Sequence, residues 1–417
     1  MNPQWRNGRA PAHSPDSTRT GVILLAVVII MVDGFDLQAI GFVAPEIARS
    51  WAIELAAFGP VFSAALAGSM LGAMAAGTLT RLVGLRATLA MSLLIFGSGT
   101  LTTAFAQDLL TLMTLRFIVG LGLGAAVPVV MSIVAENSSP RFRATLIVLA
   151  LCGQPVGAIL GAALCARLIP AYGWQSAFFL GGVLPLLLIL PVLLLLKNSA
   201  VPKHADMRHV RPTEASARVR RLFAADLRAT TTLLWAASFL GVFFIYIIVN
   251  WLPGLVRSDG HSLQMSVRAI SFFNFGGILG ALTWSALMDR YGPFKVLPAA
   301  FGLAAFSMAM LDPLRGAPSA FTAATFLSGF AGYGGVMALG PLTVMLYPRS
   351  AQTLGTGWVI GTGRLGAALG PLGAGFALAA GLAMSQLFYF AAGAALLVMT
   401  SLILLATLAS TSLHPRQ

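Results

Sequence analysis

Residues 21–47 read GVILLAVVIIMVDGFDLQAIGFVAPEI, and this stretch decides the fold class. Its first twelve residues, from Gly21 to Val32, contain no polar side chain. A helix that crosses a bilayer needs about 20 mostly apolar residues, and this run is longer than that. The run could imitate a signal peptide, but no small-residue cleavage site follows it and eleven further apolar runs do. We therefore predict a retained membrane-spanning helix.

The composition of all 417 residues is also that of a membrane protein. Hydrophobic residues make up 58% of the chain and charged residues 9%, against about 45–50% and about 25% in soluble proteins. A soluble enzyme is excluded, because a globular fold could not bury so much apolar surface. The net charge of +13 does not indicate nucleic-acid binding, since so few residues are charged. Cys152 and Cys165 both lie in apolar stretches, so we expect neither a disulfide framework nor a metal site.

Twelve apolar runs of sufficient length follow one another along the chain, which predicts an all-α integral membrane protein. Their boundaries are set by charged residues and by clusters of Pro and Gly, to within about four residues. The runs cover 21–47, 56–80, 86–106, 109–135, 143–169, 174–196, 229–256, 266–289, 294–311, 318–347, 350–380 and 383–409.

Basic residues are distributed unequally between the two sides of such a membrane protein. If the N-terminus is cytoplasmic, nineteen of the 26 Lys and Arg residues lie on that side and five on the other. The remaining two, Arg116 and Arg364, lie inside predicted spans. Because positive charge collects on the cytoplasmic side of membrane proteins, we expect both termini to be cytoplasmic.

A polar interval from Lys197 to Arg228 divides the twelve spans into six and six. Its prolines, scattered arginines and few apolar residues are typical of a tethering linker. We predict an N-terminal tail, a six-helix half, this linker, a second six-helix half and a C-terminal tail, with bounds at 1–20, 21–196, 197–228, 229–409 and 410–417.

Each half carries a similar element between its second and third spans. The first half reads Gly77-x3-Arg81-Leu82-x-Gly84, and the second reads Ser285-x3-Asp289-Arg290-x-Gly292. The matched spacing predicts an internal repeat. Two six-helix halves with matching loops are typical of a secondary transporter.

Ionisable residues inside the spans are few, and each is costly in lipid unless it is paired or hydrated. Asp33 and Asp36 are three residues apart on one face of the first helix. Repulsion between the two carboxylates favours protonation of one of them. Arg116 enters from the other side, and at about 1.5 Å of rise per residue it lies level with both acids. We expect an ion pair or a hydrated cavity between these helices; a static salt bridge that only fixes packing is the alternative.

Arg364 is the corresponding cation of the second half, in Gly361-Thr362-Gly363-Arg364-Leu365-Gly366. The neighbouring glycines allow another backbone to approach closely. A guanidinium at that depth is suited to binding a carboxylate, so Arg116 and Arg364 are both candidates to bind a substrate anion. It is equally suited to bonding carbonyl groups across a helix interface.

Other polar groups at membrane depth are candidates to line a cavity, or else to bond between helices or anchor them at the membrane interface. They are Asn250, Trp251, Asn274, Gln154 and Tyr246. Near the cytoplasmic helix ends, Glu136 followed by Arg141 and the pair Asp289-Arg290 are gating candidates. For Glu136, pairing with the adjacent arginines is the simpler expectation.

Several motifs are absent from the sequence. All five histidines lie outside the spans, and there is no Gly-x4-Gly-Lys-Ser/Thr phosphate-binding loop. We therefore expect no cofactor and no direct use of ATP. An ion gradient must then drive any uphill transport, and the Asp33 and Asp36 pair is the candidate proton-coupling group.

Longer motifs resemble the aromatic acid:proton symporter family of the major facilitator superfamily, over nearly the whole chain. The first helix carries Asp33-Gly34-Phe35-Asp36-Leu37-Gln38-Ala39-Ile40-Gly41. The resemblance continues in Arg116-Phe117 with Gly120-Leu121-Gly122-Leu123-Gly124, the run from Glu136 to Arg143, Cys152-Gly153 with Pro155 and Gly157-Ala158, Gly173-Trp174 leading to Gly181-Gly182-Val183-Leu184-Pro185, Asn250-Trp251-Leu252-Pro253, and Gly363-Arg364-Leu365-Gly366-Ala367.

This resemblance implies proton-coupled uptake of an aromatic carboxylate, such as a hydroxybenzoate or hydroxyphenylpropionate, across a bacterial inner membrane. It further implies that transport depends on Asp33, Asp36, Arg116 and Glu136. The expected partners are the aromatic acid, protons and the lipid bilayer, and we expect a monomer. Proton-antiport efflux and a membrane chemoreceptor for aromatic acids are the alternatives.

One departure from the family pattern concerns the loop after the second span. The family carries an Asp-Arg pair there, whereas this chain has Arg81-Leu82. The acid that would latch the cytoplasmic side of the first half is missing, so closure on that side is expected to be weaker or differently arranged.

Overall fold

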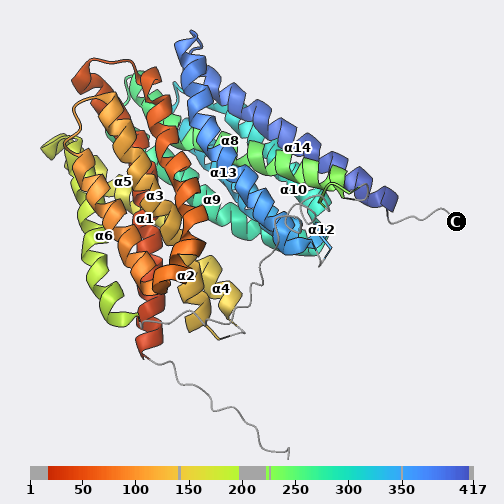
Figure 1. The fold of residues 1–417 in the computed structure, drawn as a ribbon. Helices are drawn as coiled ribbons and strands as arrows, with labels where there is room; N and C mark the ends of the chain where they lie inside the picture. Colours follow the sequence, from red (N-terminus) through yellow and green to blue (C-terminus); the bar gives the residue numbers. More distant parts are fainter. Residues whose placement is uncertain (1–16, 140–141, 197–221, 225–226, 349–350, 413–417) are drawn as a thin grey trace, which may run out of the picture.

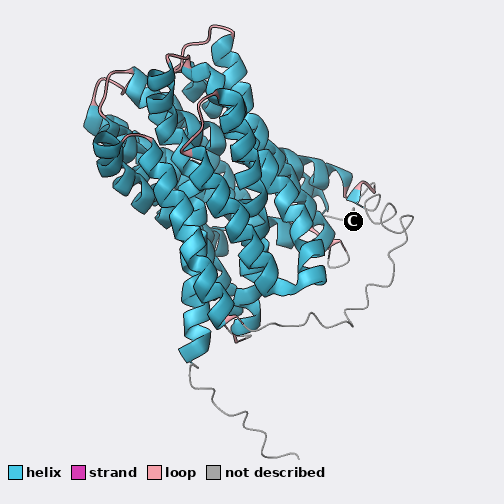
Figure 2. Ribbon diagram, turned by 60° about the vertical axis from the view of Figure 1, so that its left-hand side comes forward, coloured by secondary structure: helices cyan, strands magenta, loops and turns pink. Residues whose placement is uncertain are grey.

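The computed structural model describes residues 17–139, 142–196, 222–224, 227–348 and 351–412. Every regular element within these residues is helical (Figure 2). Most of the predicted tails and linker, and the candidate Arg141, lie outside the described residues.

The helices of the two groups follow the predicted spans closely. The first group comprises α1 Ser17–Trp51, the 3-10 turn η1 Leu55–Phe58, α2 Gly59–Thr103, α3 Leu109–Asn137, α4 Arg143–Leu151, α5 Gly153–Tyr172 and α6 Gln175–Leu195. The second comprises α8 Arg228–Ser258, α9 Leu263–Tyr291, α10 Pro293–Leu311, α11 Pro318–Ser328, the π-helical segment η2 Gly329–Tyr333, α12 Gly334–Leu346, α13 Gln352–Ala379 and α14 Gln386–Ser412.

Ten of the described helices are long and apolar enough to cross a membrane. One of them, Leu55–Thr103, spans 49 residues and contains two of the predicted spans. The helix α13 has 28 residues and is not among the ten. It contains eight glycines and Arg364, which contribute little apolar surface. If α2 is counted as two spans and α13 is included, the total agrees with the twelve predicted spans.

The two copies of the repeated loop element have the same backbone conformation. Gly84 has φ 86° and ψ 165°, and Gly292 has φ 83° and ψ 149°. A side chain is rarely tolerated at such positive φ, so each glycine is required for the turn between two spans. At Gly84 the turn interrupts α2, which is otherwise continuous.

The two groups of helices touch at one end and diverge toward the other (Figure 1). We call the end at which α1 ends and α2 begins the closed end, and the end at which α1 begins the open end. At the closed end, Glu46 of α1 forms an ion pair of 2.6 Å with Arg257 of α8. Deeper in the same interface, the side-chain amides of Gln38 and Asn274 donate to each other at 3.0 and 2.9 Å.

Candidate functional site

A cavity of about 360 Å³ lies between the two groups of helices. It extends from the middle of α1 toward the open end, where residues near the end of α12 and the start of α13 line it. Most of its wall is apolar. The polar side chains that line it are Asp33, Ser69, Gln154, Ser238, Tyr246, Thr343, Thr356 and Arg364.

Arg364 is the cationic side chain that lines this cavity. It projects from α13, which packs closely against α8 because glycines of α13 face the backbone and side chains of α8. A methyl group on Gly366 would lie 2.2 Å from the carbonyl oxygen of Phe239, and one on Gly363 would lie 2.9 Å from Ser238 Oγ. The guanidinium of Arg364 reaches across to the first group and donates to Ser69 Oγ at 3.3 Å. Its side chain is partly exposed to the cavity.

Asp33 supplies the anionic group of the same cavity. Its carboxylate accepts a hydrogen bond of 2.9 Å from Gln154 Nε2 of α5. Asp33, Tyr246 and Arg364 all line this cavity. The structure therefore brings an acid from α1, an amide from α5, a phenol from α8 and a guanidinium from α13 around one hollow.

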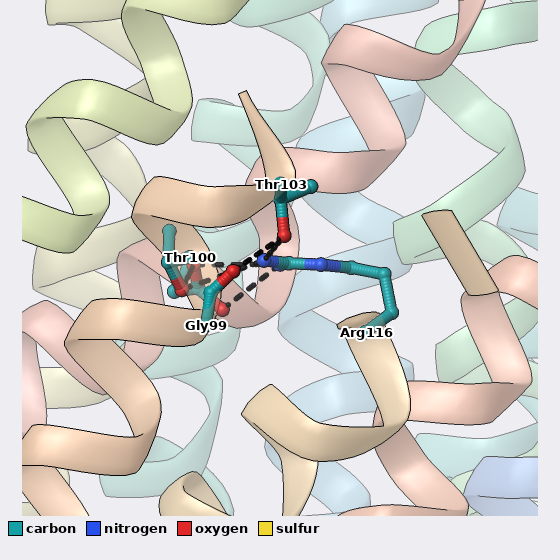
Figure 3. A network of polar contacts seen from close by, with 5 residues as sticks. Gly99, Thr100, Thr103 and Arg116 are labelled. Carbon is teal, nitrogen blue, oxygen red and sulfur yellow. Dashed lines mark hydrogen bonds and ion pairs between the residues drawn. The ribbon is translucent and has the colours of Figure 1, made fainter. Parts of the chain in front are cut away.

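Asp36 and Arg116 lie away from this cavity, in a buried network within the first group. Arg116 Nη1 is 3.2 Å from the Asp36 carboxylate, and each side chain is only 1% exposed. Arg116 also donates to Thr103 Oγ1 at 3.0 Å and points toward Thr100 of α2 (Figure 3). Its guanidinium carbon lies 5.0 Å from the centre of the Phe178 ring. The ion pair expected between these helices is therefore present, but Arg116 has no access to the cavity.

The two acids of α1 have different surroundings although they are only three residues apart. Residues i and i+3 are offset by about 60° around a helix. Asp33 is thereby directed toward Gln154 and the cavity. Asp36 is directed toward Thr100, which donates to it at 2.9 Å, and toward Arg116.

Asn250 and Trp251 are placed in the interface between helices and do not line the cavity. Asn250 Nδ2 donates to the Tyr246 carbonyl at 2.8 Å. Trp251 Nε1 donates to the Pro371 carbonyl at 3.3 Å, and its ring lies edge-on to Phe62 at 5.1 Å. Both residues are almost fully buried. This geometry supports packing and gives them no contact with a molecule in the cavity.

The gating candidates that the structure describes lie at the open end. Glu136 is near the end of α3, and Asp289 and Arg290 are near the end of α9; all three side chains are exposed. The guanidinium of Arg290 lies over the ring of the adjacent Tyr291 at 5.2 Å.

The contacts that seal the closed end were not predicted as functional pairs. Asn274 is predicted only as a polar group at membrane depth, and the sequence patterns assign no role to Glu46 or Arg257. Sequence spacing carries no signal for partners 211 or 236 residues apart, such as Glu46 with Arg257 and Gln38 with Asn274.

A sequence model of the Major Facilitator Superfamily matches residues 26–311 and 261–417 of this chain. The chain belongs to this superfamily. As a major facilitator protein it is a membrane transporter and not an enzyme.

Individual relatives share about a third of their residues with this superfamily member. The 4-hydroxybenzoate transporter PcaK of Pseudomonas putida is 33% identical over 84% of both chains. The gallate transporter of Pseudomonas putida is 32% identical over 88% of this chain and 87% of its own length. The 3-(3-hydroxy-phenyl)propionate transporter of Escherichia coli strain K12 is 34% identical over 88% of this chain and 90% of its own length.

Solved major facilitator structures have the same fold at much lower identity. The nucleoside transporter NupG gives a TM-score of 0.75 at 12% identity, covering 93% of this chain and 99% of its own. The D-xylose-proton symporter gives 0.71 at 14% identity, covering 93% and 96%.

Proposed function

We propose that this protein is a proton-driven symporter that takes up an aromatic carboxylate, such as a hydroxybenzoate or a hydroxyphenylpropionate. The observation that carries the proposal is the cavity that holds Arg364 and Asp33 together between the two groups of helices. The names of the relatives support this substrate class.

The cavity has the chemistry that an aromatic acid requires. A volume of about 360 Å³ is within the range of small-molecule sites, about 300–1,000 Å³. Its apolar wall, including Leu66, Val336 and Val359, suits an aromatic ring. The guanidinium of Arg364 can bind a carboxylate through two parallel hydrogen bonds. Arg364, and not Arg116, is therefore our candidate for the anion-binding residue.

Asp33 is our candidate for the residue that carries the coupled proton. It lies in the cavity beside the anion-binding arginine, so its charge and that of the substrate act on the same guanidinium. Asp36 instead pairs with Arg116 at 3.2 Å and does not line the cavity. We assign to Asp36 and Arg116 the role of maintaining the arrangement of α1, α2 and α3.

Transport requires the cavity to open alternately to the two sides of the membrane. We propose that the protein lies in the bacterial inner membrane with both termini cytoplasmic, because nineteen basic residues against five favour that orientation. The open end would then face the cytoplasm, and the closed end would have to separate for substrate to enter. Glu136, Arg141, Asp289 and Arg290 would gate the cytoplasmic side in the opposite state.

The moving bodies would be the six-helix halves 21–196 and 229–409, joined by the linker 197–228. One chain contains both halves of the cavity wall, so a monomer suffices. The only species that the proposal requires are the aromatic acid, protons and the bilayer, with no cofactor.

The direct test is uptake of radiolabelled 4-hydroxybenzoate or 3-hydroxyphenylpropionate by cells that produce the protein, with and without a protonophore. We expect uptake that the protonophore abolishes and that Asp33→Asn reduces to background. Uptake by Asp33→Asn that remains proton-dependent and equal to the wild type would refute the mechanism. Everted vesicles distinguish symport from efflux. A proton gradient directed into the vesicles would drive the substrate of a symporter in and the substrate of an antiporter out.

A further inference from the structure

Gln154 faces both the Asp33 carboxylate and the cavity, and the sequence patterns alone assign it no definite role. We infer that Gln154 is a positioning residue for proton coupling, which holds Asp33 by a hydrogen bond in both of its protonation states. The inference rests on the proposed function. It identifies the uncharged Gln154 amide as the partner of Asp33, the residue proposed to carry the proton.

The position of Gln154 relative to Asp33 is fixed by the backbones of two helices. A methyl group on Gly34 would lie 2.0 Å from the carbonyl oxygen of Gln154, and one on Gly157 would lie 1.8 Å from that of Met31. Helices α1 and α5 are therefore in backbone contact at Gln154 and one turn further along α5. The backbone of Gln154 cannot move away from Asp33 without separating the helices, which keeps the side-chain amide, now at 2.9 Å, within reach of the carboxylate.

The chemistry of an amide suits an acid that must bind and release a proton. The ionised carboxylate only accepts hydrogen bonds, and Gln154 Nε2 donates to it. A protonated carboxyl group can donate, and the Gln154 carbonyl oxygen can accept after the amide rotates. The partner of Asp36 offers no such choice. A guanidinium has donors only, so Arg116 can donate to Asp36 but cannot accept a hydrogen bond from it.

The other ionisable groups that face Asp33 come from several elements. Arg364 of α13 and Tyr246 of α8 lie across the cavity, and Asp36 lies one turn further along α1. Arg116 of α3 is directed to Asp36. No ionisable residue occurs in α6, and the other helices packed on α1 carry their charges near their ends or at the Gly84 turn. Arg364 will bind the substrate anion during transport, whereas Gln154 remains with Asp33 throughout.

The test is the pH dependence of proton-driven 4-hydroxybenzoate uptake by the purified full-length protein in liposomes. Gln154→Met keeps the approximate size of the side chain but removes the donor to the ionised carboxylate. The pH of half-maximal uptake should rise by about one unit, because the hydrogen bond lost from the charged carboxylate is stronger than the one lost from the neutral carboxyl group. Gln154→Glu, which also fits the site, should raise it as well, because two neighbouring carboxyl groups share a proton.

Ser69→Ala provides the matched control, because Ser69 lines the same cavity and contacts Arg364 but not Asp33. It should change the KM for 4-hydroxybenzoate and leave the pH of half-maximal uptake in place. If both Gln154 variants transport with the wild-type pH dependence, Gln154 has no positioning role. The same conclusion follows if Ser69→Ala shifts the pH of half-maximal uptake as much as the Gln154 variants do. A wild-type protein without proton-dependent uptake would instead overturn the proposed function itself.

Discussion

Arg116 and Arg364 are both held at membrane depth, but their surroundings differ. Arg116 is 1% exposed, paired with Asp36 and bonded to Thr103. Arg364 is partly exposed to the cavity, and it donates a long hydrogen bond of 3.3 Å to Ser69 Oγ. The first arrangement holds helices together, and the second leaves donors available for a ligand.

Substituting each arginine should therefore produce a different defect. Arg116→Gln leaves Asp36 buried without its charge partner, and breaking such a pair costs about 3–5 kcal/mol. We expect a large drop in thermal stability in detergent, measured by tryptophan fluorescence. Arg364→Gln should melt close to the wild type but bind 4-hydroxybenzoate about 10- to 150-fold more weakly, as expected for a charge-assisted hydrogen bond. Equal stability losses in the two variants would contradict this distinction.

The depth of a residue along its helix was predictable from the sequence, but the direction in which its side chain points around the helix was not. A rise of about 1.5 Å per residue places Arg116 level with Asp36, where the structure has the ion pair. The same reasoning treats Asp33 and Asp36 as one pair on one face. Their separation into a cavity and a buried network depends on which neighbours stand on each side of α1, and a single sequence does not contain that information.

Glycines determine how closely the helices cross. The shortest approach between α1 and α5 is at Gly157, where a methyl group would lie 1.8 Å from the Met31 carbonyl oxygen. Gly157→Ala should force the helices apart and destabilise the protein by about 3 kcal/mol, at the upper end of overpacking costs. The matched control is Gly77→Ala in α2, where an added methyl group meets nothing within 4 Å. It should stabilise the protein by about 0.5–1 kcal/mol, since alanine is the better helix former. Similar melting temperatures for the two variants would disprove the packing argument.

Asp108 caps the start of α3, and its titratable carboxyl group lies outside the membrane-spanning segments. Asp108 accepts hydrogen bonds from the backbone N–H of Thr111 at 2.8 Å and from its hydroxyl at 2.7 Å. The Thr111 backbone bond is the main cause of a lowered pKa of Asp108. A lowered pKa means that the stabilisation is present above the unfolded-state pKa, about 3.9, and is lost as the pH falls through the folded-state pKa.

Asp108→Asn should distinguish the stability that comes from capping the helix from the stability that comes from the negative charge of Asp108. Asparagine caps helices as well as aspartate does, so the variant should melt close to the wild type near pH 7. Below about pH 4 the wild type should lose more stability than the variant, as followed by circular dichroism. Parallel acid transitions of the two proteins would show that this carboxylate does not contribute.

The existence of the helices was predictable, whereas their interruptions were less so. The turn glycines Gly84 and Gly292 were recognisable from the repeated spacing. The break between α4 and α5 at Cys152 and the π-helical segment Gly329–Tyr333 fall inside predicted continuous spans. At the π-helical segment, Trp284 Nε1 of α9 donates to the Phe330 carbonyl at 2.8 Å. Such irregularities arise from contacts with other helices, which local sequence patterns do not describe.

At the scale of the whole molecule, the closed end is maintained by few polar contacts. Glu46→Gln removes the partner of Arg257, and an ion pair of this exposure is worth at most about 1 kcal/mol. We expect the closed end to open more often. An Ala48→Cys probe, in a background without Cys152 and Cys165, should then react with a thiol reagent about two- to fivefold faster. Exchanging the charges in Glu46→Arg with Arg257→Glu should restore the slow rate. An unchanged rate in Glu46→Gln would mean that the pair does not hold this end shut.

The glycine-rich helix α13 extends unbroken from the cavity to the interface at the closed end. It carries Arg364 and, about 16 Å further along, Gly375, on which an added methyl group would lie 2.8 Å from the Cα atom of Gly59 in α2. Arg364 at the proposed anion site and Gly375 at the closed end therefore lie on the same helix. A tilt of α13 that lifts Gly375 away from Gly59 would also displace Arg364 relative to Asp33. We therefore expect α13 to couple substrate binding at Arg364 to opening of the closed end.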